Sequence, residues 1–406
     1  MKNIKVLGLL FISFFFMGGL FTLVSTLTSN ELNSGERSVL LNSSCNRENK
    51  NYAEWRGEHQ NYLYIIAESY YDLGFLTGKY LISQINAFDN IIDYFIYTLN
   101  LDLQNILYLA NNYQIPKSYK EEMYGIADAT GLTYEEILLQ VVFLDLYYGI
   151  LIPMQISGGN IGACTAFAVK NRNSHFVLGQ TMDFGLIFKP TLVWVHHKII
   201  GKEEVFALRM GASTLAIGKS RKVSCTLNLV QTWKSGDFGI PTSIKCRFAF
   251  ENCKNAGKFL SIMISSFCAS WNYIISDKKG TILTVESVPG IAVINKVNKN
   301  NFAVKTNLYT TEQLKLFLID PFYSLARQQK AEQLIKAKLT QKRNFRIQDG
   351  ITVELYYDGS DASICRYPNP YDPLSIATLA SFTTSFWKKG YFGIGTPDIL
   401  LEKIPI

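Results

Sequence analysis

Histidine is scarce in this sequence of 406 residues, which has four: His59, His175, His196 and His197. None of them stands in a known cysteine–histidine protease signature, and no cysteine and histidine spacing of the zinc-binding type is present. We therefore expect no metal site and no bound cofactor. A catalytic cysteine in this chain would need a base other than histidine to take its proton.

Charged residues are also few, at 18% of the chain against 48% hydrophobic residues. This balance is typical of a folded protein and excludes a disordered one. The net charge is +7, but Lys and Arg are scattered rather than gathered in a stripe. We therefore expect no nucleic-acid partner. The length allows one large core or two ordinary ones.

One long apolar run, from Val6 to Leu27, follows two lysines near the N-terminus. The pattern predicts a signal peptide over residues 1–29. Because the run is long enough to span a bilayer, an uncleaved membrane anchor at 6–27 is the alternative. Either way we expect the rest of the chain to enter the secretory route, toward a lysosome-like vacuole or the outside of the cell. Asn42, in the string Asn-Ser-Ser, is a predicted glycosylation acceptor.

Seven cysteines are consistent with that route. Without Cys164, the other six form an even number that could pair in an oxidising lumen, although sequence does not show the partners. Cys246 and Cys253 are the first pair to consider because they are close in the chain. Two buried thiols are an equal alternative for that pair.

The pattern from about Tyr52 to Leu151 is helical. Two glycines one turn apart, the first of them Gly74, lie on a face that another element could approach closely. A later helix is expected to end at Gly131, and Thr133 with Glu136 forms a capping box that opens the next one.

Cys164 and Asp183 lie at the same open end of a predicted hairpin. Its strands are Gly162 to Val169 and His175 to Phe184, with the cysteine opening the first and the aspartate closing the second. We expect the two side chains to face each other across one end of it. Further expected elements are strands at 191–195, 204–208 and 223–230, a helix at 244–266, a hairpin at 271–286, a helix at 320–339 and short strands from 375 onward.

A cysteine at that place suits a nucleophile that becomes a chain terminus. Cleavage of the Ala163–Cys164 peptide would free an α-amine with a reference pKa of about 8, which can act as the base for its own thiol. The glycines before it would let the scissile peptide bend toward the thiol. The competing interpretation is a small buried hydrophobe, which is the commoner state of a single cysteine.

At these residues the sequence resembles the N-terminal-nucleophile (Ntn) hydrolases of the choloylglycine hydrolase and penicillin acyltransferase type. The string Gly179-Gln180-Thr181-Met182-Asp183-Phe184 is most similar to the acyl-coenzyme A:6-aminopenicillanic acid acyltransferase (isopenicillin N acyltransferase) branch. Bile salt hydrolases usually carry Arg where Gln180 stands. Weaker matches follow in order from about residue 70 to the end.

The resemblance implies an α+β fold, a four-layer αββα sandwich of two mostly antiparallel sheets preceded by a helical pro-segment. It also implies three parts: residues 1–29, a helical small chain or pro-segment at 30–163, and a large Ntn-hydrolase chain at 164–406. Small and large chains would arise from one precursor by self-cleavage between Ala163 and Cys164.

The resemblance also implies the site, with catalytic residues Cys164, Asp183, Asn228, Asn307 and Arg327 and substrate-binding residues Gln180 and Phe184. Asn228 and Asn307 are expected to stabilise the oxyanion together with a backbone N–H. Arg327 would be a buried guanidinium that lowers the pKa of the thiol, and Asp183 would hold the freed amine.

The implied activity is that of a self-processing cysteine amidohydrolase or acyltransferase. It would act through an acyl-Cys164 intermediate on a small-molecule acyl amide or an acyl-CoA-like thioester, with hydrolysis or transfer left open. A lipid-directed acid amidase or phospholipase of the same nucleophile class is the alternative. From a different class, the chain could be a non-catalytic luminal protein that kept the fold.

Overall fold

The computed structural model describes residues 50–154, 162–298, 301–319, 322–341, 344–399 and 401–406. The expected signal segment and the acceptor Asn42 lie outside the described residues. No helix within the described ranges is long and apolar enough to cross a membrane. Residues 50–368 and 374–406 form one compact unit.

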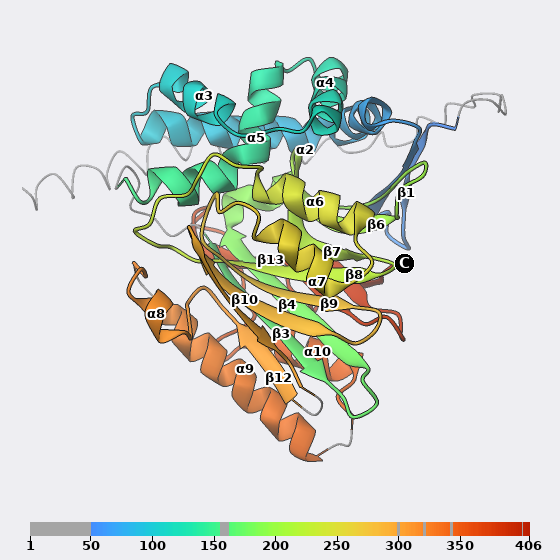
Figure 1. The fold of residues 1–406 in the computed structure, drawn as a ribbon, viewed down its shortest axis with the longest axis vertical. Helices are drawn as coiled ribbons and strands as arrows, with labels where there is room; N and C mark the ends of the chain where they lie inside the picture. The colour runs from blue at the N-terminus through green and yellow to red at the C-terminus, as the bar shows by residue number, and fades with distance from the viewer. Residues whose placement is uncertain (1–49, 155–161, 299–300, 320–321, 342–343, 400) are drawn as a thin grey trace, which may run out of the picture. The chain divides into compact units, whose positions relative to one another are not determined.

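Two sheets lie at the centre of that unit (Figure 1). The larger has nine strands in the order β1-β2-β5-β6-β7-β8-β9-β10-β11, and only β2 and β5 pair in parallel. Its strands are β1 (Tyr52–Arg56), β2 (Tyr62–Ala67), β5 (Leu192–Ile199), β6 (Val205–Met210), β7 (Ser213–Ser220), β8 (Val223–Leu229), β9 (Trp271–Asp277), β10 (Ile282–Val288) and β11 (Ile291–Lys296).

The smaller sheet has six strands in the order β12-β3-β4-β13-β14-β15, all antiparallel to their neighbours. Its strands are β3 (Gly162–Lys170), β4 (Phe176–Gly185), β12 (Asn301–Lys305), β13 (Ile376–Thr384), β14 (Tyr391–Ile394) and β15 (Glu402–Lys403). Strands β3 and β4 of this sheet contact β8 of the larger one, so the two sheets pack face to face.

Helices cover both outer faces. Helices α2, α5, α6 and α7 contact the larger sheet, and α9 and α10 contact the smaller one (Figure 1). The helices are α2 (Tyr70–Thr98), α3 (Leu103–Asn111), α4 (Lys117–Thr130), α5 (Tyr134–Leu146), α6 (Thr242–Asn252), α7 (Ala256–Met263), α8 (Glu312–Lys315), α9 (Phe322–Gln341) and α10 (Ile347–Glu354), with short turns η1 (Tyr147–Leu151) and η2 (Leu186–Thr191). The expected four-layer αββα order is confirmed.

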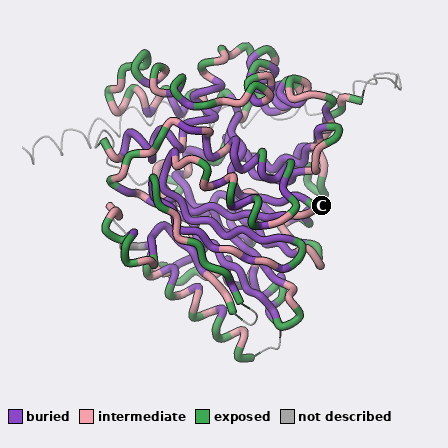
Figure 2. The backbone as a smooth tube through the Cα atoms, in the orientation of Figure 1, coloured by how far each residue is buried: buried purple, intermediate pink, exposed green. Residues whose placement is uncertain are grey.

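Strand β3 is buried on both faces (Figure 2). Phe167 and Val169 pack with apolar residues of α9, whereas Ala166 and Ala168 pack with Ile274 of β9 in the opposite sheet. The alternation of side chains along a strand explains this division. Even-numbered residues of β3 therefore point between the sheets and odd-numbered ones toward the helices.

The expectation of a purely helical segment before Cys164 is wrong at its start. Residues Tyr52–Arg56 and Tyr62–Ala67 are strands, and the second of them pairs in parallel with β5. The run Tyr-Leu-Tyr-Ile-Ile is rich in aromatic and β-branched residues, which favour a strand when a sheet edge is present to receive them. The proposed small chain therefore supplies two strands of the larger sheet.

The single helix expected at 244–266 is also wrong. Two helices, α6 and α7, are separated at Cys253, whose backbone is extended, and the side chain of Asn255 caps the second helix through the N–H of Lys258. The six described cysteines are free, so the Cys246–Cys253 disulfide is not formed.

Local signals elsewhere are confirmed. Helix α4 ends at Gly131, which has φ 79°, and Thr133 and Glu136 exchange the two bonds of a capping box at the start of α5. A Cβ added to Gly74 would lie 2.0 Å from the carbonyl oxygen of Glu122 on α4, which accounts for glycine at the α2–α4 crossing.

Candidate active site

Cys164 lies near the start of β3, with 7% of its surface exposed. By the alternation of β3, its side chain points between the two sheets, toward β8. The expected direct pairing with Asp183 is wrong by one residue, because Cys164 pairs with Met182 and Ala163 pairs with Asp183. A one-residue offset reverses the face of a strand side chain. The carboxyl group therefore lies across from Ala163, which carries the carbonyl of the candidate cleavage site.

The main chain of Cys164 is held by side chains. Its N–H donates to Asn307 Oδ1 at 2.7 Å, and its carbonyl oxygen accepts a bond from Arg327 Nη1. Strand β12, the neighbour of β3 on this side, pairs only as far as Ala166. The side chains of Asn307 and Arg327 therefore bond the main chain of Cys164, where β12 no longer pairs with β3.

Asn307 is fixed at both ends of its amide. Oδ1 also accepts from Arg327 Nη2 at 2.8 Å, and Nδ2 donates to Leu229 O at 2.8 Å. With one of its N–H donors already committed to β8, Asn307 is better placed to accept a bond from the nitrogen of Cys164 than to stabilise an oxyanion. The oxyanion role that the resemblance implied for Asn307 stays a prediction.

Arg327 reaches the site from α9 and is almost fully buried. Nη1 also donates to Thr165 Oγ1 at 2.9 Å, and Nη2 to Ser324 Oγ at 3.2 Å. Burial lowers the pKa of Arg327 to about 10, and the nearby Asp183 and Cys164 act against that fall. The guanidinium therefore stays charged at neutral pH and supplies the positive charge of the site.

Asp183 is fully buried. Its Oδ1 accepts a bond from Thr378 Oγ1 at 2.7 Å, and its Oδ2 lies 3.9 Å from Arg366 Nε. Burial raises the pKa of Asp183 to about 6, although Arg327, Thr378 and Arg366 pull it down. A carboxyl group with this pKa can accept and return a proton near neutral pH.

The thiol itself is not activated in the uncut chain. Burial raises the pKa of Cys164 to about 12, the charge of Asp183 adds to the rise, and Arg327 opposes it. The expected lowering by Arg327 is therefore present but is outweighed. A thiol in this state needs a base to become a nucleophile.

Asn228 lies on β8 and is fully buried. Neither Oδ1 nor Nδ2 of its side chain has a hydrogen-bond partner among the described residues. A buried amide without a partner costs free energy, so it calls for an explanation in terms of use. An amide donor kept free on β8, a strand that contacts β3, suits an oxyanion that forms only during reaction.

The two residues expected to contact substrate, Gln180 and Phe184, differ in how their side chains are held. The side chain of Gln180 is fully buried and bonded at both ends to the main chain of Leu227. Phe184 packs edge-on against Phe188, and a Cβ added to Gly162 would lie 2.5 Å from its ring. The ring of Phe184 thus covers the chain that enters the cleavage site, and its contact with substrate stays a prediction.

Three residues of this network were not among the expected site residues: Thr165, Arg366 and Thr378. The Thr378 bond to Asp183 spans 195 positions. No local pattern marks a residue whose partner is that distant. Among the described residues, no set of three His, Cys, Asp or Glu side chains is grouped as metal ligands would be.

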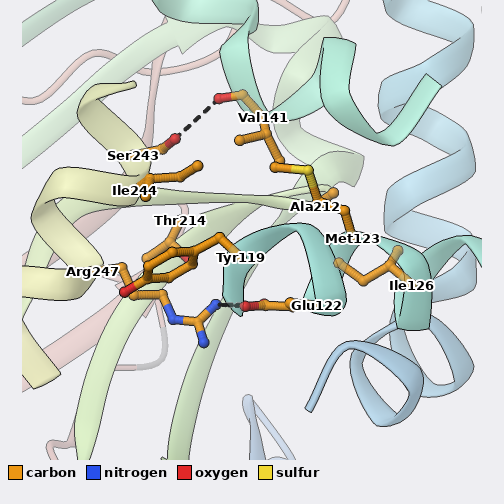
Figure 3. A pocket seen from close by; sticks show the side chains of 10 residues that line it. All are labelled: Tyr119, Glu122, Met123, Ile126, Val141, Ala212, Thr214, Ser243, Ile244 and Arg247. Atoms are coloured by element: carbon orange, nitrogen blue, oxygen red, sulfur yellow. Dashed lines mark hydrogen bonds and ion pairs between the residues drawn. The ribbon is translucent and has the colours of Figure 1, made fainter. Parts of the chain in front are cut away.

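A second polar cluster joins α4 to α6 beside a small cavity of about 20 Å³ (Figure 3). Glu122 is paired there with Arg247 and, at 3.4 Å, with Arg209. Arg247 also bonds Glu251 at 2.8 Å. The cavity holds about one water molecule, and this cluster links the segment before Cys164 to the segment after it.

Solved structures of a bile acid hydrolase and a penicillin acylase are similar to this chain. Two mutant forms of the conjugated bile acid hydrolase from Clostridium perfringens have 12% and 14% identity and TM-scores of 0.40 and 0.42, and each match covers 59% of this chain and 92% of the other. Penicillin V acylase from Agrobacterium tumefaciens has 14% identity and a TM-score of 0.39, over 57% and 83%. No protein-family model and no curated protein matches the chain.

Proposed function

We propose that this chain is a self-processing cysteine amidohydrolase of the Ntn type, with Cys164 as its nucleophile. One observation carries the proposal: the nitrogen of Cys164 donates to Asn307, which Arg327 holds in turn. A structural cysteine needs no such arrangement around its own main chain. A residue that will become an N-terminus needs its nitrogen held before and after the cut.

The first act would be self-cleavage. The Sγ of Cys164 attacks the carbonyl carbon of Ala163, and the thiol proton passes to Asp183 through water, because the carboxyl group lies on the other face of the hairpin. The proton passes to the nitrogen of Cys164 as the C–N bond breaks, leaving a thioester between Ala163 and Cys164. Water then hydrolyses the thioester to a carboxylate on Ala163 and a free thiol. The position of Asp183 across from Ala163 supports this role.

The second act would use the mature Cys164. Its α-amine, with a reference pKa of about 8, takes the thiol proton, while Asn307 and Asp183 hold that amine. The thiolate attacks the carbonyl of an acyl amide or acyl thioester, and Asn228 donates to the developing oxyanion. The acyl group then leaves Cys164 for water, which is hydrolysis, or for an acceptor amine, which is transfer.

We also propose that the small and large chains stay together after the cut. Residues on the two sides of the cut are bonded to each other: Tyr70 Oη donates to Glu251 at 2.7 Å, and Asp145 accepts from the main-chain N–H of Thr242 at 2.6 Å. Strand β2 would remain paired with β5. The apolar run at 6–27 would direct or anchor this assembly to the secretory route.

Intact mass and gel analysis of protein made in a secretory host tests self-cleavage. The wild type is expected to give two fragments, the larger beginning at Cys164, and Cys164→Ala a single chain. Cys253→Ala is the matched control because Cys253 is another buried free thiol, and it should be cut normally. A single uncut chain in the wild type would contradict the proposal.

Substrate class is tested with purified protein on phenoxyacetyl amides, acyl ethanolamides and phospholipids side by side. Turnover of amides, lost in Cys164→Ala, is expected. Turnover of phospholipids alone would favour a phospholipase of the same nucleophile class, and full amide activity in the variant would contradict the role of Cys164. Adding an acceptor amine and measuring the acyl product separates transfer from hydrolysis.

A further inference from the structure

Strand β8 loses one of its two neighbours partway along its length. Strand β7 pairs with it only at Cys225 and Ser224, whereas β9 pairs with it as far as Leu229. All of β8 is buried. From Thr226 onward, the edge that faced β7 needs other partners, because buried main-chain N–H and C=O groups are almost always bonded.

Side-chain amides supply those partners. Gln180 Nε2 donates to Leu227 O at 2.5 Å, and Leu227 N donates to Gln180 Oε1 at 3.0 Å. The amide of Gln180 thereby replaces one peptide unit of the missing strand. Two residues further along, Asn307 Nδ2 bonds Leu229 O at 2.8 Å. The residue between these two anchored positions is Asn228, whose own amide has no partner among the described residues.

Gln180 can reach β8 because of its place on β4. It pairs with Ala166 of β3, which points between the sheets, so Gln180 lies on the same face of the hairpin as Cys164. Asn307 bonds both Leu229 O and the N–H of Cys164. The nucleophile and the free amide of Asn228 are thus tied to the same set of anchors.

We propose that Gln180 is a positioning residue that fixes Asn228 relative to Cys164, and not a substrate contact. The kinetic consequence of this inference rests on the proposed function. Nε2 and Oε1 of Gln180 both bond Leu227, and a hydrogen bond from the same side chain opposes the rise that burial causes in the pKa of the Cys164 thiol, so its polar atoms serve the main chain of β8 and the thiol. Replacing it would leave two buried main-chain groups unbonded and let β8 shift, and a misplacement of about 1 Å at a reacting centre can cost about 10²-fold in rate.

Gln180→Leu keeps the size of the side chain and removes both bonds. We expect kcat for amide turnover to fall about 10²-fold, with little change in KM. Gln180→Glu keeps the acceptor for Leu227 N and loses the donor to Leu227 O, so its kcat should lie between those of the wild type and the leucine variant. A rise in KM with kcat unchanged would overturn the proposal, because it would indicate lost substrate binding.

A double variant with Asn228→Ala tests whether Gln180 acts through Asn228. Once the amide of Asn228 is gone, adding Gln180→Leu should slow turnover little further, since there is no donor left to misplace. Independent effects multiply, whereas effects through one group do not. Full multiplication of the two rate losses would overturn the proposal.

Gln140→Leu is the matched control. Gln140 is a second buried glutamine, which donates to Ile85 O at 3.1 Å and accepts from Ala212 N at 3.1 Å. Its loss should lower Tm to a similar extent but leave kcat unchanged. A similar fall in kcat in both variants would show general destabilisation and overturn the positioning role.

Hydrogen exchange gives a readout that does not depend on activity. Exchange of the main-chain amides over residues 226–230 should be faster in Gln180→Leu than in the wild type or in Gln140→Leu. Unchanged exchange there would overturn the proposal that Gln180 fixes β8 at Leu227, even if kcat falls. If exchange rises in Gln180→Leu but the wild type turns over no amide, Gln180 still positions Asn228 and the proposed function fails.

Discussion

Asn228 is the residue on which the proposed chemistry depends most directly. Because its buried amide has no partner among the described residues, Asn228→Ala removes an oxyanion donor without breaking a hydrogen bond. We expect kcat to fall about 10²- to 10³-fold, the loss typical of one oxyanion donor, with Tm nearly unchanged. Steady-state kinetics and thermal unfolding measure the two effects.

Asn272→Ala is the natural comparison. Asn272 pairs with Asn228 across β8 and β9, but its Nδ2 donates to the carbonyl oxygens of Thr306 and Leu308. Its replacement should lower stability, because two bonded carbonyls lose their donor. An Asn228→Ala protein with wild-type kcat would contradict the oxyanion role.

The pH dependence of self-cleavage is a second prediction at this scale. Burial raises the pKa of Asp183 to about 6. If the carboxylate takes the thiol proton, the cleavage rate should be full above that pH and fall below it, as protonation removes the base. Thr378→Val removes a hydrogen bond that favours the ionised form, so the midpoint should move to higher pH.

The measurement is the rate of fragment appearance after refolding, at intervals from pH 5 to pH 8 chosen to bracket a pKa of about 6. Asp183→Asn should be cut slowly at every pH, with no midpoint in this range. A midpoint that stays in place in Thr378→Val would contradict Asp183 as the proton acceptor.

At the scale of elements, Glu122 on α4 joins the helical layer to the rest of the unit. It is buried between Arg247 of α6 and Arg209 of β6. Glu122→Ala leaves two buried guanidinium groups without this carboxylate, and removing one partner of a buried pair costs about 3–5 kcal/mol. Urea unfolding should show a loss of this size.

The adjacent Glu121 provides the control. Its side chain is 46% exposed and lies 4.0 Å from Lys117. Exposed pairs of this kind contribute about 0–1 kcal/mol, so Glu121→Ala should leave the free energy of unfolding almost unchanged. Equal losses in the two variants would mean that the buried cluster has no special role.

For the whole molecule, the prediction concerns the two fragments left by cleavage. The segment before Cys164 supplies strands β1 and β2, the buried carboxylates Glu122 and Asp145, and the half-buried Tyr70. Its separation would expose these charges and an edge of the larger sheet. The fragments should therefore co-elute in size exclusion and separate only in denaturant.

The same measurement on the Glu122→Ala variant tests the association of the two fragments further. The cut variant should release the small fragment at a lower urea concentration than the cut wild type, because the cluster that joins the fragments is broken. A large fragment that elutes alone from the wild type under native conditions would contradict the association.

The sequence alone determined the features that depend on neighbours within a few residues. The Thr133–Glu136 capping box, the helix end at Gly131 and the hairpin carrying Cys164 follow from local patterns and are present in the structure. The αββα order and the set of site residues came from a resemblance spread over the chain. Four of those residues do lie around the start of β3: Cys164, Asp183, Asn307 and Arg327. The catalytic roles of all the predicted site residues stay predictions.

Only the tertiary structure decided what depends on distant partners. The run at 62–67 favours a strand locally, but it becomes one because β5 provides an edge for it, and the sequence does not show that edge. Asp183 faces Ala163 rather than Cys164 because the whole hairpin sets the register. Gln180 bonds the main chain of Leu227 because β7 stops pairing with β8 at Cys225 and leaves Leu227 without a strand neighbour there. The physical reason is common to all three: a strand's partners, and the faces they impose, are fixed only when the sheets assemble.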